Sequence, residues 1–166
     1  NGGKDLISNN LSKSSKSNSV IVSNPNYSNL KNLVKLNNSS FGNIKSNLRS
    51  KQLLSRNWEY REGFEKEGEE IERILDGDLI TWNFATTDAV LKIKSPKILH
   101  IITHGFYFPK TEANEKALTR SGIVLAGAND ANILEDGYLT ALEMSTIDLE
   151  GTELVTISAC ESGEGD

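Results

Sequence analysis

The chain has 166 residues, 37% of them hydrophobic, which suits one domain and is too short for two domains with separate cores. A single cysteine excludes a disulfide framework and a cysteine-rich zinc site, and a free thiol favours a reducing compartment such as the cytoplasm. Residues 1–50 hold seven Lys/Arg and one acid, whereas residues 51–166 hold eleven Lys/Arg and twenty-two acids. The acidic part predicts no direct nucleic-acid binding, and no apolar run reaches the roughly 18–20 residues of a membrane span.

The first 50 residues are dominated by two polar residue types, with twelve Asn and twelve Ser. Such a composition buries too little apolar surface to offset its ordering entropy. We therefore expect a disordered polar tail over 1–18 and a mobile loop over about 28–58. The exception is Val20-Ile21-Val22, a β-branched run followed by an Asn-Pro turn, which predicts one buried strand.

From residue 59 onward, helix and strand patterns alternate along the chain. We expect a helix over 59–76, a strand over 79–82, a helix capped by Thr86 or Thr87, a strand over 98–103, a loop over 106–121, a hairpin from 123–125 and 136–139, a helix over 141–147 capped by Thr140, and a strand over 153–159. The strands 98–103 and 153–159 are apolar at nearly every position, which is typical of buried parallel strands. The alternation predicts a layered α/β fold with a mostly parallel sheet.

Two residues with reactive side chains come at the ends of these apolar strands. His104 follows the strand over 98–103, and Cys160 follows the strand over 153–159. If the strands are parallel neighbours, an imidazole and a thiol meet at one edge of the sheet, where the histidine can take the thiol proton. Gly105 lets the backbone turn sharply and leaves its N–H open to an oxyanion. A lone cysteine is, on the other hand, more often a buried core residue than a nucleophile.

Two other kinds of site have less support from the sequence. His100 and His104 are four residues apart, which would suit two zinc ligands on a helix, but the β-branched residues between them indicate a strand. We therefore expect His100 to be packed and hydrogen-bonded. A nucleotide-binding domain is disfavoured because no glycine-rich turn follows the first strand.

The two apolar strands and the residues after them resemble the motifs of a known family. LHIITHG at residues 99–105 and LVTISACESG at residues 154–163 resemble the LHxxTHG and LSACETG motifs of the CHAT domain family. This family consists of caspase-like peptidase domains that are often found in bacteria behind tetratricopeptide repeats. The sequence departs from the pattern at Ile157 and Ser162, both mild changes. The similarity runs over about 19–166, apart from the loop near 28–58.

The resemblance implies a caspase-like three-layer sandwich with a mostly parallel central sheet, of which residues 19–166 form a part that lacks the C-terminal strands. It implies that His104 is the catalytic histidine and Cys160 the nucleophile. The N–H groups of Gly105 and Cys160 would form the oxyanion hole, and Ser158 would line the pocket for the substrate side chain before the scissile bond. The implied chemistry needs no metal and no organic cofactor.

The implied function is a cysteine endopeptidase that cuts a protein substrate in a regulated bacterial signalling or defence pathway in the cytoplasm. The tetratricopeptide-repeat region of the same protein is an implied partner. An alternative is a non-catalytic interaction module that keeps the peptidase fold and signals by binding, although a scaffold has no physical need for both the cysteine and the histidine.

Caspase-like folds generally have six main strands, and the sequence yields about four before Asp166. We therefore expect the remaining C-terminal segment, or a separate small chain, to complete the sheet. Cleavage at Asp166 stays an open alternative. Cleavage after an acidic residue would need a basic pocket, for which Arg56 and Arg61 are the available arginines.

Overall fold

The computed structural model describes residues 18–28, 56–108, 116–130 and 137–160. The predicted tail and most of the predicted mobile loop lie outside these residues. The elements in chain order are β1 (Val20–Pro25), α3 (Glu62–Leu75), β2 (Asp78–Trp82), α4 (Thr87–Leu91), β3 (Ile98–Tyr107), the short 3-10 helix η1 (Ala117–Thr119), β4 (Ser121–Val124), β5 (Tyr138–Thr140), α5 (Ala141–Met144) and β6 (Leu154–Cys160). None of the helices in these four ranges is long and apolar enough to cross a bilayer.

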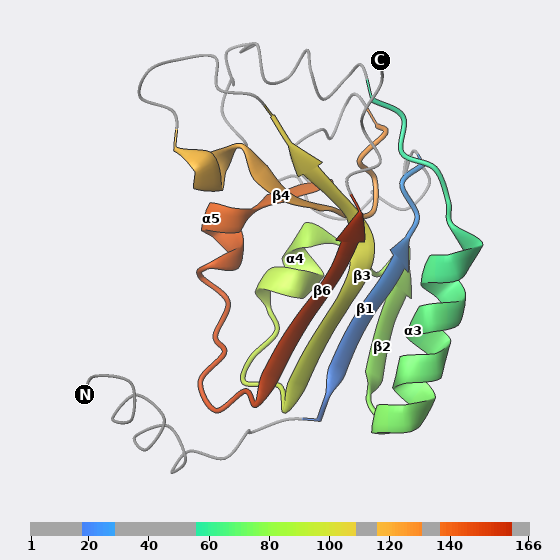
Figure 1. The fold of residues 1–166 in the computed structure, drawn as a ribbon, viewed down its shortest axis with the longest axis vertical. Helices are drawn as coiled ribbons and strands as arrows, with labels where there is room; N and C mark the ends of the chain where they lie inside the picture. Colours follow the sequence, from blue (N-terminus) through green and yellow to red (C-terminus); the bar gives the residue numbers. More distant parts are fainter. Residues whose placement is uncertain (1–17, 29–55, 109–115, 131–136, 161–166) are drawn as a thin grey trace, which may run out of the picture.

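Four strands form a parallel sheet in the order β2, β1, β3 and β6 (Figure 1). The two apolar strands are parallel neighbours as predicted, because β6 pairs with β3 from Ile98–Leu154 onward. Past the parallel part, β3 pairs with antiparallel β4, which in turn pairs with β5. The protein is therefore a mixed α/β structure with a six-stranded mixed sheet.

Helices pack on both faces of the central strands, which explains why these strands are apolar at nearly every position. On one face Ser23 Oγ of β1 donates a hydrogen bond to the Phe64 carbonyl of α3 at 2.6 Å. On the other face Val22 packs in one buried cluster with Val90 of α4 and Ile101 of β3. Since successive side chains of a strand point to opposite faces, Val22 and Ser23 contact different helices.

Helix α3 approaches β1 closely through a glycine. A Cβ atom at Gly68 would lie 2.3 Å from Ser23 Oγ, so no larger residue fits there without a shift. Ile71 and Leu75 share this face of α3 because they lie three and seven residues further on. Ile74 is 65% exposed, because it projects away from the line through Gly68, Ile71 and Leu75.

Strand β3 is longer than the sequence predicts. A loop was expected from Phe106, but β3 continues to Tyr107. The extension is stabilised by pairing with β4 and by burial of Phe106 and Phe108 in an aromatic cluster that also contains Trp58 and Tyr138. Aromatic residues at alternate positions of the expected loop were the signal for this extension.

Strand β6 is less buried than its apolar sequence predicts. The exposed fractions are 53% for Leu154, 41% for Val155 and 47% for Ile157. Among the described residues β6 pairs only with β3, so it forms one edge of the parallel sheet (Figure 1). The expectation of a buried strand is therefore wrong for β6 as described, because among the described elements no second strand lies beside it to flank these side chains.

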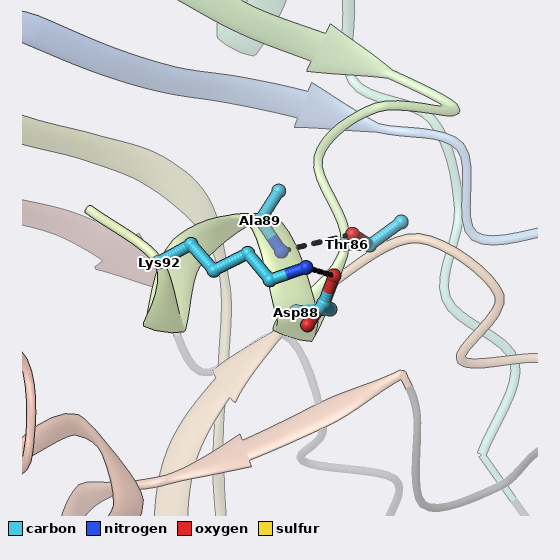
Figure 2. Close-up of polar contacts among 4 residues, drawn as sticks. All are labelled: Thr86, Asp88, Ala89 and Lys92. Atoms are coloured by element: carbon cyan, nitrogen blue, oxygen red, sulfur yellow. Dashed lines mark hydrogen bonds and ion pairs between the residues drawn. The ribbon is translucent and has the colours of Figure 1, made fainter. Parts of the chain in front are cut away.

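Both predicted helix caps are present. Thr140 accepts a hydrogen bond from the Glu143 N–H, and the Glu143 carboxylate accepts one from the Thr140 N–H, which makes a capping box. The helix that follows is shorter than expected and ends at Met144. At the start of α4, Thr86 Oγ1 accepts from the Ala89 N–H at 3.2 Å (Figure 2).

The Thr86 cap stabilises the helix that carries the buried Val90. We expect Thr86→Ala to lower the free energy of unfolding by about 1 kcal/mol, because the Ala89 N–H loses its acceptor. Lys92→Met removes the exposed ion pair with Asp88 on the same helix (Figure 2) and should cost less than about 0.5 kcal/mol. Chemical denaturation measures both values, and an equal loss in the two variants would contradict this role of the cap.

Candidate active site

His104 lies inside the protein, near the end of the parallel part of β3. It is 1% exposed, and three aromatic rings surround its imidazole. The distances from the imidazole centroid are 5.1 Å to Tyr27, 5.3 Å to Trp58 and 5.0 Å to Phe64. These rings come from the segment after β1, the segment before α3 and α3 itself. We call Tyr27, Trp58 and Phe64 the aromatic cage.

One hydrogen bond fixes the protonation pattern of this imidazole. Nε2 of His104 lies 2.8 Å from the carbonyl oxygen of Glu59. Because a carbonyl oxygen can only accept, Nε2 carries the proton. In the neutral ring Nδ1 is then the nitrogen with the lone pair. Sequence reasoning did not find Glu59, because a backbone carbonyl leaves no signal in residue type.

The cage also sets the proton affinity of His104. Burial lowers the pKa of His104 below its usual 6.5, since the charged imidazolium loses hydration in the cage. The hydrogen bond to the Glu59 carbonyl acts in the opposite direction, and the positive charge of Arg61 lowers the pKa further. His104 is therefore neutral at pH 7, the form that can accept a proton.

The strand register brings Cys160 beside His104. In the parallel pairing of β3 with β6, the Cα atom of His104 is the partner of the Cα atom of Cys160. Aligned residues of neighbouring parallel strands belong to the same face of the sheet. Ser158 lies two residues earlier on β6 and is aligned with Ile102. The three predicted site residues His104, Cys160 and Ser158 thus share one face at one end of the sheet.

Gly105 does not make the sharp turn that was expected after His104. It lies within β3, opposite Ile123 of antiparallel β4. The Phe108 N–H donates to the Arg120 carbonyl at 2.8 Å, and hydrogen-bonded pairs alternate with non-hydrogen-bonded pairs along such a ladder. By this alternation the Gly105–Ile123 pair is not hydrogen-bonded, so the Gly105 N–H points away from β4.

A comparison with protein families adds the decisive observation. The model of the CHAT domain matches residues 3–166, which is nearly the whole chain. The chain belongs to the CHAT domain family. The family is one of caspase-like peptidases. Comparisons with curated proteins and with solved structures find no match.

A buried hydroxyl pair supports the histidine strand of this CHAT domain. Tyr27 and Thr103 hydroxyl oxygens are 2.9 Å apart, and Thr103 donates onward to the Val124 carbonyl. The single Thr103 proton is used in that bond, so Tyr27 is the donor to Thr103. Burial raises the pKa of Tyr27 to about 12, so its hydroxyl stays protonated. Tyr27 was missed because it lies in the Asn- and Ser-rich part of the sequence.

His100 does not join His104 in a common site. Its Nε2 atom lies 3.4 Å from Oε1 of Glu67 on α3, so it is packed and partnered as predicted. Within the described parts of the chain, no three His, Cys, Asp or Glu residues are grouped as metal ligands.

The two arginines considered for a basic pocket differ in position. The Arg56 guanidinium lies 5.7 Å from the ring centroid of Trp58 and 5.0 Å from that of Phe108. Arg61 is exposed at the N-terminus of α3. Of the two, Arg56 is therefore the one that stacks on a ring of the aromatic cage.

The lowered pKa of His104 predicts a specific loss of stability in acid. Unfolding raises this pKa toward 6.5, so the unfolded chain binds the proton at a higher pH than the folded protein does. The free energy of unfolding therefore decreases as pH drops below about 6.5. The contribution of one such group is at most about 1.4 kcal/mol per pH unit. We expect His104→Gln to lack this part of the pH dependence between pH 7 and 5.5, as measured by chemical denaturation. The same pH dependence in both proteins would contradict a buried, neutral His104.

Proposed function

We propose that this CHAT domain is the catalytic part of a cysteine endopeptidase, with His104 and Cys160 as its catalytic dyad. The parallel register that makes their Cα atoms partners is the observation that carries this proposal. The hydrogen bond from His104 Nε2 to the Glu59 carbonyl supports it further, because it leaves Nδ1 as the proton acceptor. The family of the chain agrees with this chemistry.

The reaction follows from these two groups. Nδ1 of His104 takes the proton of the Cys160 thiol, and the thiolate attacks the carbonyl carbon of the scissile peptide bond. The N–H groups of Gly105 and Cys160 stabilise the oxyanion that forms. The imidazolium then gives its proton to the leaving amine, and a thioester with Cys160 remains. Water hydrolyses the thioester, which releases the carboxylic acid and restores the thiol.

The substrate in this proposal is a protein, and Ser158 lines the pocket for the side chain before the scissile bond. Ser158 shares the sheet face of His104 and Cys160 and is partly buried. Regulation by a tetratricopeptide-repeat region of the same protein, in the cytoplasm, belongs to the same proposal.

We further propose that another polypeptide segment pairs with the outer edge of β6 and completes a caspase-like three-layer sandwich. This segment comes from the rest of the protein or from a separate small chain. A strand edge with unpaired N–H and C=O groups favours pairing with another strand. Leu154 is exposed on one face of β6, and Val155 and Ile157 are exposed on the other. Both faces therefore present apolar surface that an added element can cover.

The dyad predicts separate effects for the two histidines. In the full-length protein Cys160→Ala should abolish substrate cleavage, and His104→Ala should slow alkylation of Cys160 by iodoacetamide at pH 7 by roughly 100-fold or more. His100→Gln is the matched control, since it changes the other histidine of β3 and should leave both rates unchanged. Cleavage at the normal rate by Cys160→Ala would leave the non-catalytic interaction module as the better account.

Completion of the sheet predicts that Ile157 is buried in the full-length protein. Ile157→Ala should then lower the free energy of unfolding by roughly 2–4 kcal/mol, the cost of truncating a buried isoleucine. Ile74→Ala on the exposed face of α3 makes the same truncation and should change it by less than about 0.5 kcal/mol. Equally small losses in both variants, measured by chemical denaturation, would show that nothing covers β6.

A further inference from the structure

The segment over 56–61 crosses the active-site face of β3 without forming a helix or strand. It supplies two contacts to His104, the ring of Trp58 and the carbonyl of Glu59. Trp58 is the buried residue of this segment, and the main-chain N–H and C=O groups of a buried residue need hydrogen-bond partners. The residues that provide these partners therefore determine where the Glu59 carbonyl lies.

Asn129, in the turn after β4, binds the main chain of this segment with its side chain. The Trp58 N–H donates to Asn129 Oδ1 at 2.9 Å, and Asn129 Nδ2 donates to the Trp58 carbonyl at 2.8 Å. The orientation of the amide is fixed by these partners, because an N–H only donates and a carbonyl only accepts. Both hydrogen bonds involve the residue directly before Glu59.

The main chain of Asn129 binds a second part of the cage. Its N–H donates to the Tyr27 carbonyl at 2.8 Å, and the nearby Gly127 N–H donates to the Asn26 carbonyl at 2.9 Å. Asn129 therefore joins the backbones of Tyr27 and Trp58, two of the three cage residues whose rings contact His104. In the described ranges, the side chain of Asn129 hydrogen-bonds both the N–H and the C=O of Trp58.

We propose that Asn129 is a positioning residue for the catalytic base. It holds the main chain of Trp58 so that the Glu59 carbonyl accepts a hydrogen bond from Nε2–H of His104. The proton of the neutral ring then stays on Nε2, and Nδ1 stays unprotonated and able to accept the thiol proton. This proposal rests on the proposed function for its catalytic meaning. An amide is suited to this task, because it presents one donor and one acceptor in a fixed plane, whereas a carboxylate presents only acceptors.

The test compares Asn129→Ala with the wild type in the full-length protein, using two readouts. Nitrogen-15 NMR of the imidazole reports the fraction of neutral His104 with its proton on Nε2, and iodoacetamide alkylation reports the reactivity of Cys160 against pH. We expect the Nε2–H fraction to fall and alkylation at pH 7 to slow by roughly tenfold or more, as when a group that orients a functional histidine is lost. A folded Asn129→Ala protein with an unchanged Nε2–H fraction would overturn the proposal.

Two further variants separate positioning from stability. Thr86→Ala loses a helix cap on α4 (Figure 2) and should leave the tautomer and the alkylation profile as in the wild type. A change of the tautomer in Thr86→Ala equal to that in Asn129→Ala would assign the effect to general destabilisation and overturn the proposal. If Asn129→Ala does not fold, the isosteric Asn129→Asp keeps the acceptor for the Trp58 N–H and loses the donor. It should also reduce the Nε2–H fraction, and an unchanged fraction would again overturn the proposal.

The tautomer readout does not depend on peptidase chemistry. If His104→Ala leaves alkylation of Cys160 unchanged, the proposed function fails, even where Asn129→Ala shifts the tautomer. If His104→Ala slows alkylation but Asn129→Ala shifts nothing, the dyad stands and the role of Asn129 fails.

Discussion

The parallel pairing of β3 with β6 is the constraint on which the proposed chemistry depends. It aligns His104 with Cys160 over a register that runs continuously from Ile98 and Leu154. A slip by one residue would move Cys160 to the other face of the sheet, away from the face of His104. Strand β3 is held in place by its pairing with β1 on the other side and by the buried core. Strand β6 therefore aligns against a strand whose position is fixed.

The aromatic cage connects the packing of the protein with the chemistry of its base. Burial in the cage keeps His104 neutral, because the imidazolium loses hydration there. Burial would also leave the Nε2–H without water, and the Glu59 carbonyl satisfies that donor. The same contacts that desolvate the ring thus select the tautomer. Asn129 extends this arrangement, since it binds the main chain next to Glu59.

The sequence predicted the parts of the fold that depend on local pattern. The apolar runs located β3 and β6, and the positions of His104 and Cys160 at their ends indicated a shared edge. The Glu59 carbonyl could not be predicted, because any residue type supplies the same backbone acceptor. Tyr27 and Trp58 were hidden in or beside an Asn- and Ser-rich stretch with no periodic apolar pattern. The apolar run of β6 indicates burial, but a sequence pattern does not say which element covers a strand.

A disulfide trap tests the alignment of His104 with Cys160 most directly. Neighbouring strands lie about 4.8 Å apart, within the range of Cα separations that a disulfide spans. Because Cys160 is the only cysteine, oxidised His104→Cys protein should contain one intramolecular disulfide between positions 104 and 160, found by peptide mapping. His100→Cys lies roughly 13 Å further along the strand and should form none. A free Cys160 thiol in the oxidised His104→Cys protein would contradict the register and the dyad built on it.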